Sequence, residues 1–479
     1  MDTASFQFVI FGLAAALVSN IKGNSHIWRS SVLMLASIAF LGVLAHNPVA
    51  LLPLVGFLLL GYAGLSLLER GWPKPMVWSI LAVIFAYIWL KKYTFLPEGI
   101  FLAYPYFTLG LSYIFFRVLH VLIETGDGDE KRHIGLGAYL LYTLNFTTLV
   151  YGPIQRYDEF ARDQFAGEPI PLGLRLVGLQ AERIVRGFFK VNVLSVLLHA
   201  VQEDALAQMQ PSFPLSLRLI AAFRVAVVYP FFLYSNFSGY IDIVIALARL
   251  MRVRLPENFD RPLSASSFLE FWSRWHITLS DWFKKYVYNP LLVALMRRLP
   301  SPSVEPWLDV FSLFATFFLV GVWHGRTSAF VVYGLLQGGG ISINRLWQLG
   351  LTRVMGRRGY KALAVNPIYV SFGRGLTFSW FSLTLFWFWA GWEEIYKVFS
   401  SISVMQWLGV WLAIWISATV VLAAWEVLRS ALLSIRSAEG PVLTSRYARV
   451  VYASGLGLIA VVMRLLLNQP APSIVYRTF

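Results

Sequence analysis

The stretch WLDVFSLFATFFLVGVW, from Trp307 to Trp323, decides the fold class of this protein. Its only charged side chain is that of Asp309. A helix needs about 20 mostly apolar residues to cross the hydrocarbon layer of a bilayer. A second apolar block, Ala329–Leu346, begins shortly afterwards. The two blocks therefore predict two membrane-spanning helices that are joined by a tight connection.

Apolar blocks of similar length recur along the whole chain. Blocks of only about 10–14 residues are too short to cross and indicate re-entrant or interfacial segments. We predict an all-α, polytopic integral membrane protein with about 11–13 transmembrane helices plus re-entrant and interfacial helices. The remaining predicted blocks are Phe6–Ile21, Trp28–Ala45, Ala50–Leu68, Met76–Leu90, Phe101–Ile123, Ile134–Tyr151, Val191–Val201, Leu217–Tyr234, Tyr240–Met251, Tyr286–Leu295, Leu376–Ala390, Trp407–Leu428 and Val450–Leu466.

Composition supports this class and excludes several functions. The chain is 57% hydrophobic and only 14% charged, whereas a soluble domain is about a quarter charged. Its net charge of +15 comes from basic residues in loops, where anionic lipid headgroups account for them, so we expect no nucleic-acid partner. Cysteine is absent, which excludes thiol nucleophiles and thiolate metal sites. No His, Asp and Glu residues have metal-ligand spacing, so we predict no metal.

The segment Ser264–Tyr288 mixes charged and aromatic residues. Ser267 followed by Glu270 predicts a helix start through a capping box, and Glu270 can pair with Arg274 one turn later. An apolar stripe at helical spacing favours an amphipathic interfacial helix. His276 lies on this stripe, where a polar ring needs a partner or a cavity. The stripe consists of Trp272, Trp275, His276, Leu279, Trp282, Phe283 and Tyr286.

His324 lies at the membrane boundary, between the blocks that end at Trp323 and begin at Ala329. Ionisable residues at that depth are costly and are therefore candidates for a function. A neutral imidazole can accept a proton, as a general base must. The alternative is a structural histidine that bridges two helices by a hydrogen bond. Gly325 would allow a backbone or a ligand to approach closely.

Two further polar patches interrupt apolar blocks. In Tyr151–Arg156 the Gly-Pro pair breaks the helix, and Arg156 could hold an anionic group, a carbonyl group or a lipid phosphate. In Asn236–Asp242 the carboxylate of Asp242 lies just inside a predicted span and needs a partner, for which Arg249 or Arg252 could serve. Gly338–Gly340 lacks the Lys and Ser/Thr of a phosphate loop, so close helix packing is favoured.

Taken together, these patches resemble the signatures of a known family. The residues of these motifs and their order are similar to those of the membrane-bound O-acyltransferase family. The similarity is to the bacterial branch that includes the alginate O-acetylation and teichoic-acid D-alanylation membrane proteins. The motifs are Gly110-Leu-Ser-Tyr113, Gly152-Pro-Ile-Gln-Arg156, Phe237-Ser-Gly-Tyr240 with Asp242, Pro256-Glu-Asn-Phe259, Phe271–Ser280 with Trp282-Phe283, Tyr286-Val-Tyr288 and Pro290-Leu291, and Gly321-Val-Trp-His-Gly325.

The resemblance implies roles for specific residues. His324 would be the catalytic base and His276 the second active-site residue. A central tunnel would cross the membrane, with the acyl donor entering from the cytoplasmic side. Substrate-binding roles would fall to Arg156, Trp275, Trp323, Arg274, Asp242 and Tyr151.

The resemblance also divides the chain. We predict one membrane domain over residues 1–479, with N-terminal spans in 1–100, a catalytic core in 101–390 and C-terminal spans in 391–479. The sequence departs from the family pattern where Leu292-Val293 replaces a Gly-Gly pair, where Gln337 replaces a common histidine and where Asn236 replaces a common aspartate. Both histidines are nevertheless present.

These observations lead to a hypothesis for the reaction. The acyl donor would be a thioester, either acetyl-CoA or a phosphopantetheinyl carrier protein, with no tightly bound cofactor. Basic loops such as Arg156–Lys190 would meet an acidic carrier or the phosphates of the coenzyme. The acceptor would be a hydroxyl of a cell-surface polysaccharide, with acetyl as the acyl group, in the bacterial inner membrane.

Several alternatives stay open. D-alanyl transfer to a teichoic-type polymer is the close rival, and a relay to a periplasmic acetyltransferase partner is another. A polysaccharide transporter or flippase would also be polytopic and basic. That class predicts paired inverted repeats, and no such repeat stands out in the sequence.

Overall fold

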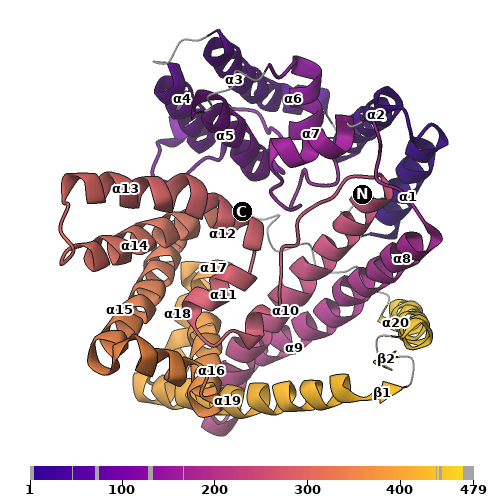
Figure 1. The fold of residues 1–479 in the computed structure, drawn as a ribbon. Helices are drawn as coiled ribbons and strands as arrows, with labels where there is room; N and C mark the ends of the chain where they lie inside the picture. Colours follow the sequence, from indigo (N-terminus) through magenta and orange to yellow (C-terminus); the bar gives the residue numbers. More distant parts are fainter. Residues whose placement is uncertain are drawn as a thin grey trace. The chain divides into compact units, whose positions relative to one another are not determined.

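The computed structural model describes residues 5–45, 47–70, 75–127, 133–165, 167–437, 440–441 and 445–467. These residues fold almost entirely as helices (Figure 1). Within them, seven helices are long and apolar enough to cross a membrane, and two shorter apolar helices, Phe6–Ile21 and Met76–Leu90, accompany them. The all-α, polytopic membrane class is therefore confirmed. The predicted total of about 11–13 crossings and the central tunnel stay predictions.

The chain divides into two compact units, and each is described by itself. The first comprises Met1–Phe188 and Gly239–Glu257, and the second comprises Phe189–Ser238 and Asn258–Phe479. The predicted boundaries after residues 100 and 390 stay predictions.

The first unit is built from short and medium helices. In chain order they are α1 (Phe6–Ile21), α2 (His26–Leu44), η1 (Pro48–Leu51), α3 (Leu52–Glu69), α4 (Pro75–Leu90), η2 (Glu98–Ile100), α5 (Leu111–Asp127), α6 (Leu136–Thr143), α7 (Tyr157–Phe165) and α8 (Leu174–Phe189).

The second unit holds the longest helices, and α10 continues from it into the first unit. Its elements are η3 (Lys190–Leu194), α9 (Ser195–Ala207), α10 (Leu215–Leu250), η4 (Pro262–Ser264), α11 (Phe268–Arg274), α12 (Ile277–Phe283), η5 (Lys284–Tyr288), α13 (Asn289–Arg298), α14 (Glu305–His324), α15 (Ser328–Ala364), α16 (Pro367–Thr384), α17 (Phe386–Trp389), α18 (Trp392–Ser400), α19 (Val404–Ser434), the two-residue strands β1 (Arg436–Ser437) and β2 (Gly440–Pro441), and α20 (Arg446–Leu467).

Local sequence explains where several helices begin. Ser5 and Ser25 each accept a hydrogen bond from the backbone N–H three residues later, at the starts of α1 and α2. Ser403 and Gln406 form a reciprocal capping box at the start of α19. Such caps satisfy backbone donors that have no partner inside the helix.

Four predicted spans are wrong in detail. The blocks Leu217–Tyr234 and Tyr240–Met251 form one continuous helix, α10, because the small polar residues between them do not break it. The block Ile134–Tyr151 is helical only as far as Thr143. Asn145 then accepts hydrogen bonds from the backbone and the hydroxyl of Thr147, and such local bonds compete with helix.

The block Phe101–Ile123 becomes helical only at Leu111. Gly110 immediately before it has a φ of 76°, in the left-handed region that favours glycine. A Cβ atom at Gly110 would also lie 2.4 Å from the carbonyl oxygen of Leu149. Glycine is therefore required at the start of α5.

Glycines bring α14 and α15 into backbone contact within the second unit. A Cβ atom on Gly321 would lie 2.2 Å from the Cα of Gly334, and one on Gly338 would lie 2.8 Å from the carbonyl oxygen of Phe314. The prediction of close helix packing is thus confirmed for Gly338. This approach positions the end of α14, and with it His324, against the side chains of α15.

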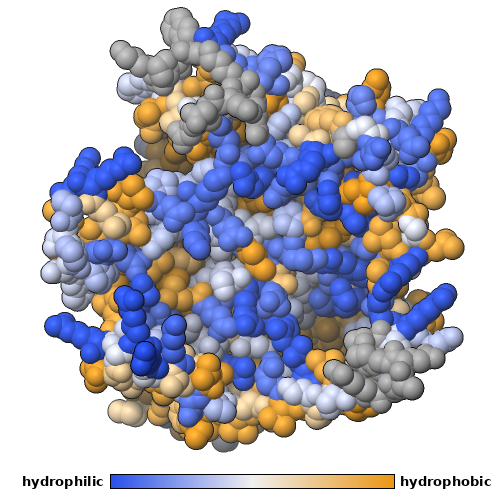
Figure 2. Space-filling view, in the orientation of Figure 1, coloured by the Kyte–Doolittle hydropathy of each residue, from blue (hydrophilic) through white to orange (hydrophobic). Residues whose placement is uncertain are grey.

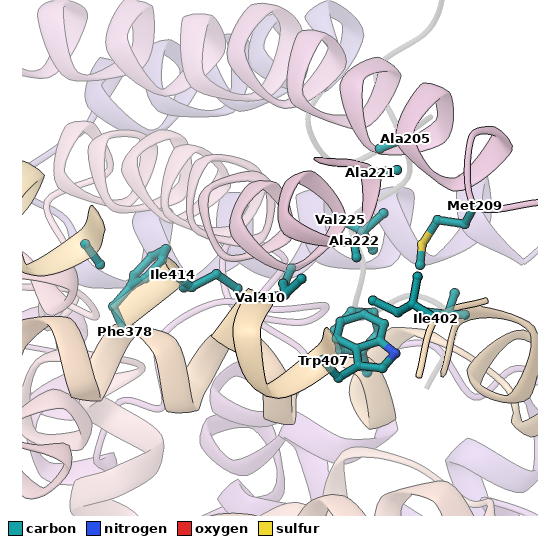
Figure 3. Close-up of a cluster of buried hydrophobic side chains, with 14 residues drawn as sticks. Ala205, Met209, Ala221, Ala222, Val225, Phe378, Ile402, Trp407, Val410 and Ile414 are labelled. Atoms are coloured by element: carbon teal, nitrogen blue, oxygen red, sulfur yellow. The ribbon is translucent and has the colours of Figure 1, made fainter. Parts of the chain in front are cut away.

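A buried cluster joins α9 and α10 to α16 and α19 in the second unit (Figure 3). Ala221, Ala222, Val225 and Ile414 belong to it and are fully buried. The outer sides of the long helices are apolar as well, and Figure 2 shows hydrophobic side chains on the surface among hydrophilic ones. On α19 the side chains of Val420, Val421 and Trp425 are exposed, as expected of a lipid-facing surface.

Candidate active site

The aromatic segment begins as the sequence predicts. Ser267 Oγ accepts from the backbone N–H of Glu270 at 3.2 Å, and Glu270 pairs with Arg274 at 2.6 Å. The second bond of the predicted capping box, in which the Glu270 side chain would accept from the backbone N–H of Ser267, is replaced by bonds to Ser266. The Glu270 carboxylate accepts from the backbone N–H and the hydroxyl of Ser266, at 2.6 and 2.7 Å.

The prediction of one continuous helix through this segment is wrong. The helix breaks between α11 and α12, and His276 has φ 45° and ψ 52°, in the left-handed region. A non-glycine residue in this conformation costs roughly 1–2 kcal/mol. Backbone bonds to a neighbouring segment offset that cost: Ile277 N donates to Asn258 O at 3.0 Å, and Asp260 N donates to Arg274 O at 2.9 Å.

His276 is completely buried at this break. Its Nδ1 lies 3.2 Å from Oδ1 of Asn258, and the ring of Phe237 packs edge-on with centroids 5.0 Å apart. The predicted need for a partner is therefore met. His276 lies outside the candidate spans. Burial, and then the nearby imidazole of His324, lower the pKa of His276 well below its usual value.

His324 is the last residue of α14 and is 3% exposed. Its Nδ1 lies 2.6 Å from the carbonyl oxygen of Val320. Aromatic rings surround it: Tyr333 of α15 and Phe388 of α17 lie with centroids 5.8 and 5.4 Å away. Gly325 permits another close approach, because a Cβ atom there would lie 2.1 Å from the ring of Phe330. His324 is thus held in an apolar setting.

The partners of the two rings fix their tautomers. A carbonyl oxygen can only accept, so Nδ1 of His324 donates to Val320. The same holds for His276 if the atom of Asn258 that faces it is the oxygen. In a neutral imidazole one nitrogen donates and the other accepts, so Nε2 carries the lone pair in each ring. In the neutral form both rings therefore have a basic Nε2.

Three other predicted site residues lie beside these histidines in the chain. Trp275 is buried, and its ring stacks on Phe271 with centroids 5.6 Å apart. Trp323 is buried, and its ring lies 4.9 Å from that of His324. Arg274 is held by Glu270 at 2.6 Å. Their predicted contacts with substrate stay predictions.

Asp242 belongs to the first unit and is 6% exposed. Its predicted partners are wrong: Arg183 donates to it at 2.9 Å and Arg186 at 3.3 Å. Arg183 also makes a two-pronged contact with Glu257, at 2.6 and 2.5 Å. This pairing has no local signal in the sequence, because Arg183 and Asp242 are 59 residues apart.

Tyr151 and Arg156 also belong to the first unit. Tyr151 is buried and packs edge-on against Tyr113 and Tyr240, with centroids 6.3 and 5.8 Å apart. The half-exposed Arg156 lies 3.5 Å from the carboxylate of Glu124. The anionic or carbonyl ligand predicted for Arg156 stays a prediction.

A cavity of about 300 Å³ lies within the second unit, between α11, α12, η5, α14 and α15. Asp309 on its wall accepts from the hydroxyl of Tyr288 at 2.5 Å and from Arg345 at 2.6 Å. The indole Nε1 of Trp272, 2% exposed, has no hydrogen-bond partner in the part of the chain that the structure describes. The other lining residues are Leu269, Ser273, Ser280, Asp281, Lys284, Leu313, Thr316, Phe317 and Ile341.

Sequence reasoning missed part of this site. Asn258 was recognised only as one letter of a motif, and Tyr333 and Phe388 were not singled out. Asn258 has no distinguishing local signal, because its motif Pro256-Glu-Asn-Phe259 also contains a charged glutamate. No signal identified the two aromatic residues, because they reach His324 from other helices. Among the described residues, no three His, Asp or Glu side chains lie close enough to hold a metal ion.

Comparisons with known proteins agree with the arrangement. A sequence model of the membrane-bound O-acyltransferase family matches residues 57–386. The chain is 30% identical over 279 residues to a teichoic acid D-alanyltransferase of Streptococcus thermophilus, covering 57% of this chain and 65% of that protein. It is 28% identical over 358 residues to the teichoic acid D-alanyltransferase of Lacticaseibacillus rhamnosus, covering 71% and 85%.

The chain is also similar to proteins named as probable alginate O-acetylases. It is 29% identical over 268 residues to a probable alginate O-acetylase of Pseudomonas fluorescens, covering 56% of this chain and 51% of that protein. The matched region thus spans between about half and 85% of these relatives. Because the family match extends over more than half of the chain, this multi-pass membrane protein belongs to the membrane-bound O-acyltransferase family.

Proposed function

We propose that the protein is an O-acyltransferase that moves an acyl group, most simply acetyl, from a thioester to a hydroxyl of a cell-surface polysaccharide. The observation that carries the proposal is the pair His276 and His324: both rings are buried and each binds an acceptor through Nδ1. Each therefore presents Nε2 as its basic nitrogen.

His324 is proposed as the base. Its Nε2 takes the proton of the acceptor hydroxyl as the oxygen forms a bond to the thioester carbonyl carbon. General-base help of this kind is worth roughly 10²–10⁴-fold in rate. The proton creates an imidazolium at the last residue of α14, where the negative end of the helix dipole stabilises a cation by about 0.3–2 kcal/mol.

The reaction then balances without another reactant. The carbon–sulfur bond breaks, the acyl group remains on the acceptor oxygen, and the leaving thiolate takes the proton back from His324. His276 is proposed to orient a substrate through Nε2, which accepts a hydrogen bond from a hydroxyl or an amide N–H of that substrate. Closing both reactants into a dry site supplies much of the rate, because it replaces a bimolecular encounter by a fixed geometry.

The 300 Å³ cavity supports a thioester donor. Phe317 on its wall precedes His324 by seven residues on α14, which is about 10 Å along a helix axis. On its wall Arg345 pairs with Asp309, and the other two charged lining residues, Asp281 and Lys284, are of opposite sign. The lining therefore carries no net charge and suits a neutral polar chain. The buried indole N–H of Trp272 would donate to an amide carbonyl, such as those in the arm of coenzyme A or of a phosphopantetheinyl carrier protein.

One observation favours the alternative of D-alanyl transfer to a teichoic-type polymer. Gln337 is fully buried; its Nε2 donates to Thr384 Oγ1 at 2.9 Å, while its Oε1 has no partner in the described chain. Gln337 lies one turn after Tyr333, whose ring packs against His324. An unpaired amide oxygen on that helix face would suit the ammonium group of a D-alanyl ester. Both a teichoic acid D-alanyltransferase and a probable alginate O-acetylase are similar to this chain.

The proposal includes a place in the cell. Both sets of relatives come from bacteria, so we assign the chain to the bacterial inner membrane. The lipid bilayer, the donor and, in a relay, a periplasmic acetyltransferase would be its partners. A relay would use the same two histidines, with a partner's hydroxyl as the acceptor.

The test is transfer by purified protein in lipid vesicles, with a radiolabelled acyl group on coenzyme A in one arm and D-alanyl carrier protein in the other. We expect label to reach an added hydroxyl acceptor with one of the two donors. Trp272→Phe keeps an aromatic ring and removes the N–H, and we expect it to raise the donor KM about tenfold, since one lost hydrogen bond costs about 1–2 kcal/mol.

A matched control is Trp78→Phe, which changes a 72% exposed tryptophan of α4 and should leave the KM unchanged. Label that stays on both donors with the wild-type protein would reject the acyltransferase. Transport of an unmodified polysaccharide in the same vesicles would favour the transporter instead.

A further inference from the structure

Asn258 holds three consecutive residues around the active-site break. It is completely buried. Its Oδ1 lies 3.2 Å from Nδ1 of His276, and it accepts from the backbone N–H and the hydroxyl of Thr278 at 3.1 and 2.9 Å. Its backbone oxygen accepts from Ile277 N at 3.0 Å. One side chain therefore bonds to His276 and to the turn that carries it.

The orientation of the Asn258 amide follows from its partners. A backbone N–H can only donate, so the atom that faces Thr278 N must be the amide oxygen. The same oxygen faces His276, so Nδ1 of His276 must be the donor. The proton is thereby held on Nδ1, and Nε2 is left as the acceptor of the ring.

Two other neighbours of the His276 ring are Phe237 and His324. The ring of Phe237, from α10, packs against it edge-on and offers no acceptor oxygen. The titratable group that acts on His276 is His324 of α14, which disfavours a positive charge there. Asn258 supplies the acceptor oxygen at Nδ1 of His276.

We infer that Asn258 is a positioning residue for acyl transfer, which holds His276 in the Nδ1-protonated form and directs Nε2 toward the reacting groups. This inference rests on the proposed function. Without the Asn258 oxygen, the proton of His276 can move to Nε2, and the ring then loses its acceptor. The residue itself touches neither donor nor acceptor in this account.

The first test reads the tautomer without any reaction. Solid-state nitrogen NMR of histidine-labelled protein in lipid bilayers distinguishes protonated from unprotonated ring nitrogens, and the signals of His276 are those that disappear in His276→Gln. We expect a protonated Nδ1 in the wild type and a mixture of tautomers in Asn258→Ala. An unchanged spectrum in Asn258→Ala would overturn the inference.

The second test is kinetic. Asn258→Ala should lower kcat about 10–100-fold, as losing an orienting partner does, with the donor KM changed less than about twofold. Thr278→Val is the matched control, because it removes a hydroxyl bond to Asn258 and leaves the bond to His276. Equal losses of kcat in both variants would show that the structure of the turn, and not the bond to His276, determines the rate. That result would contradict the inference.

Asn258→Asp keeps an acceptor oxygen, so it tests the inference even where the alanine variant does not fold. Its carboxylate stabilises an imidazolium, so the acid limb of kcat should move to higher pH by about one unit or more. An active Asn258→Asp protein with an unshifted acid limb would also overturn the inference. A wild-type protein that transfers no acyl group would instead reject the proposed function, while the NMR spectrum would still decide the role of Asn258 in the tautomer.

Discussion

Nδ1 of His324 lies 2.6 Å from the carbonyl oxygen of Val320, one turn earlier in α14. Val320 is the fifth residue from the end of α14, so its carbonyl oxygen also lies in register to accept the backbone N–H of His324. The Nδ1 bond sets the ring so that its other nitrogen is the base. The last turn of α14 thus sets both the position and the tautomer of the proposed catalytic residue.

The buried His276 predicts a pH dependence of stability. Its folded pKa is lowered, so below about pH 6.5 the unfolded chain binds a proton that the folded chain does not. The stability it contributes is present above that pH and is lost as the pH falls. We expect the free energy of unfolding to fall by about 1.4 kcal/mol per pH unit from this group alone.

Thermal unfolding in detergent between pH 7.5 and 5.5 measures this effect. The Tm of His276→Gln should fall less over this range than that of the wild type, because glutamine does not titrate. Parallel Tm curves for wild type and His276→Gln would contradict the burial of this ring.

The ion pair of Arg183 with Asp242 makes a prediction about the first unit. The Asp242 carboxylate is 9% exposed, whereas the Glu257 carboxylate that Arg183 also contacts is 61% exposed. Removing one partner of a buried pair costs about 3–5 kcal/mol, and an exposed pair is worth about 0–1 kcal/mol. Asp242→Asn should therefore lower the Tm by several degrees and Glu257→Gln by little. The reverse order would show that the Asp242 pairing is not structural.

Packing of α16 against α19 supports a prediction about helix contact in the second unit. A Cβ atom on Gly375 would lie 2.0 Å from Thr419 Oγ1 and 2.7 Å from the carbonyl oxygen of Trp415. Gly375→Ala should destabilise the protein by about 1–3 kcal/mol through overpacking. Gly409→Ala in α19 meets nothing within 4 Å and should be neutral or stabilising. Similar Tm values for the two variants would contradict this close approach.

The sequence predicted what depends on local pattern. Apolar length identified α1 to the residue, and an ionisable residue between two apolar blocks pointed to His324. The break at His276 could not be predicted, because the aromatic stripe keeps helical spacing on both sides of it. Its cause is a pairing with Asn258, 18 residues earlier. The arginine partner of Asp242 was missed for the same reason, since periodicity carries no information about contacts between distant segments.

The central claim is that Nε2 of His324 accepts the proton of the acceptor hydroxyl. Its most direct test is the single-turnover rate of acyl transfer by His324→Gln in lipid vesicles, with wild-type expression and Tm as the check on folding. Glutamine fills similar space but is no base, so we expect the rate to fall at least about 10²-fold, with donor binding retained. A folded His324→Gln protein that transfers the acyl group at the wild-type rate would contradict the account.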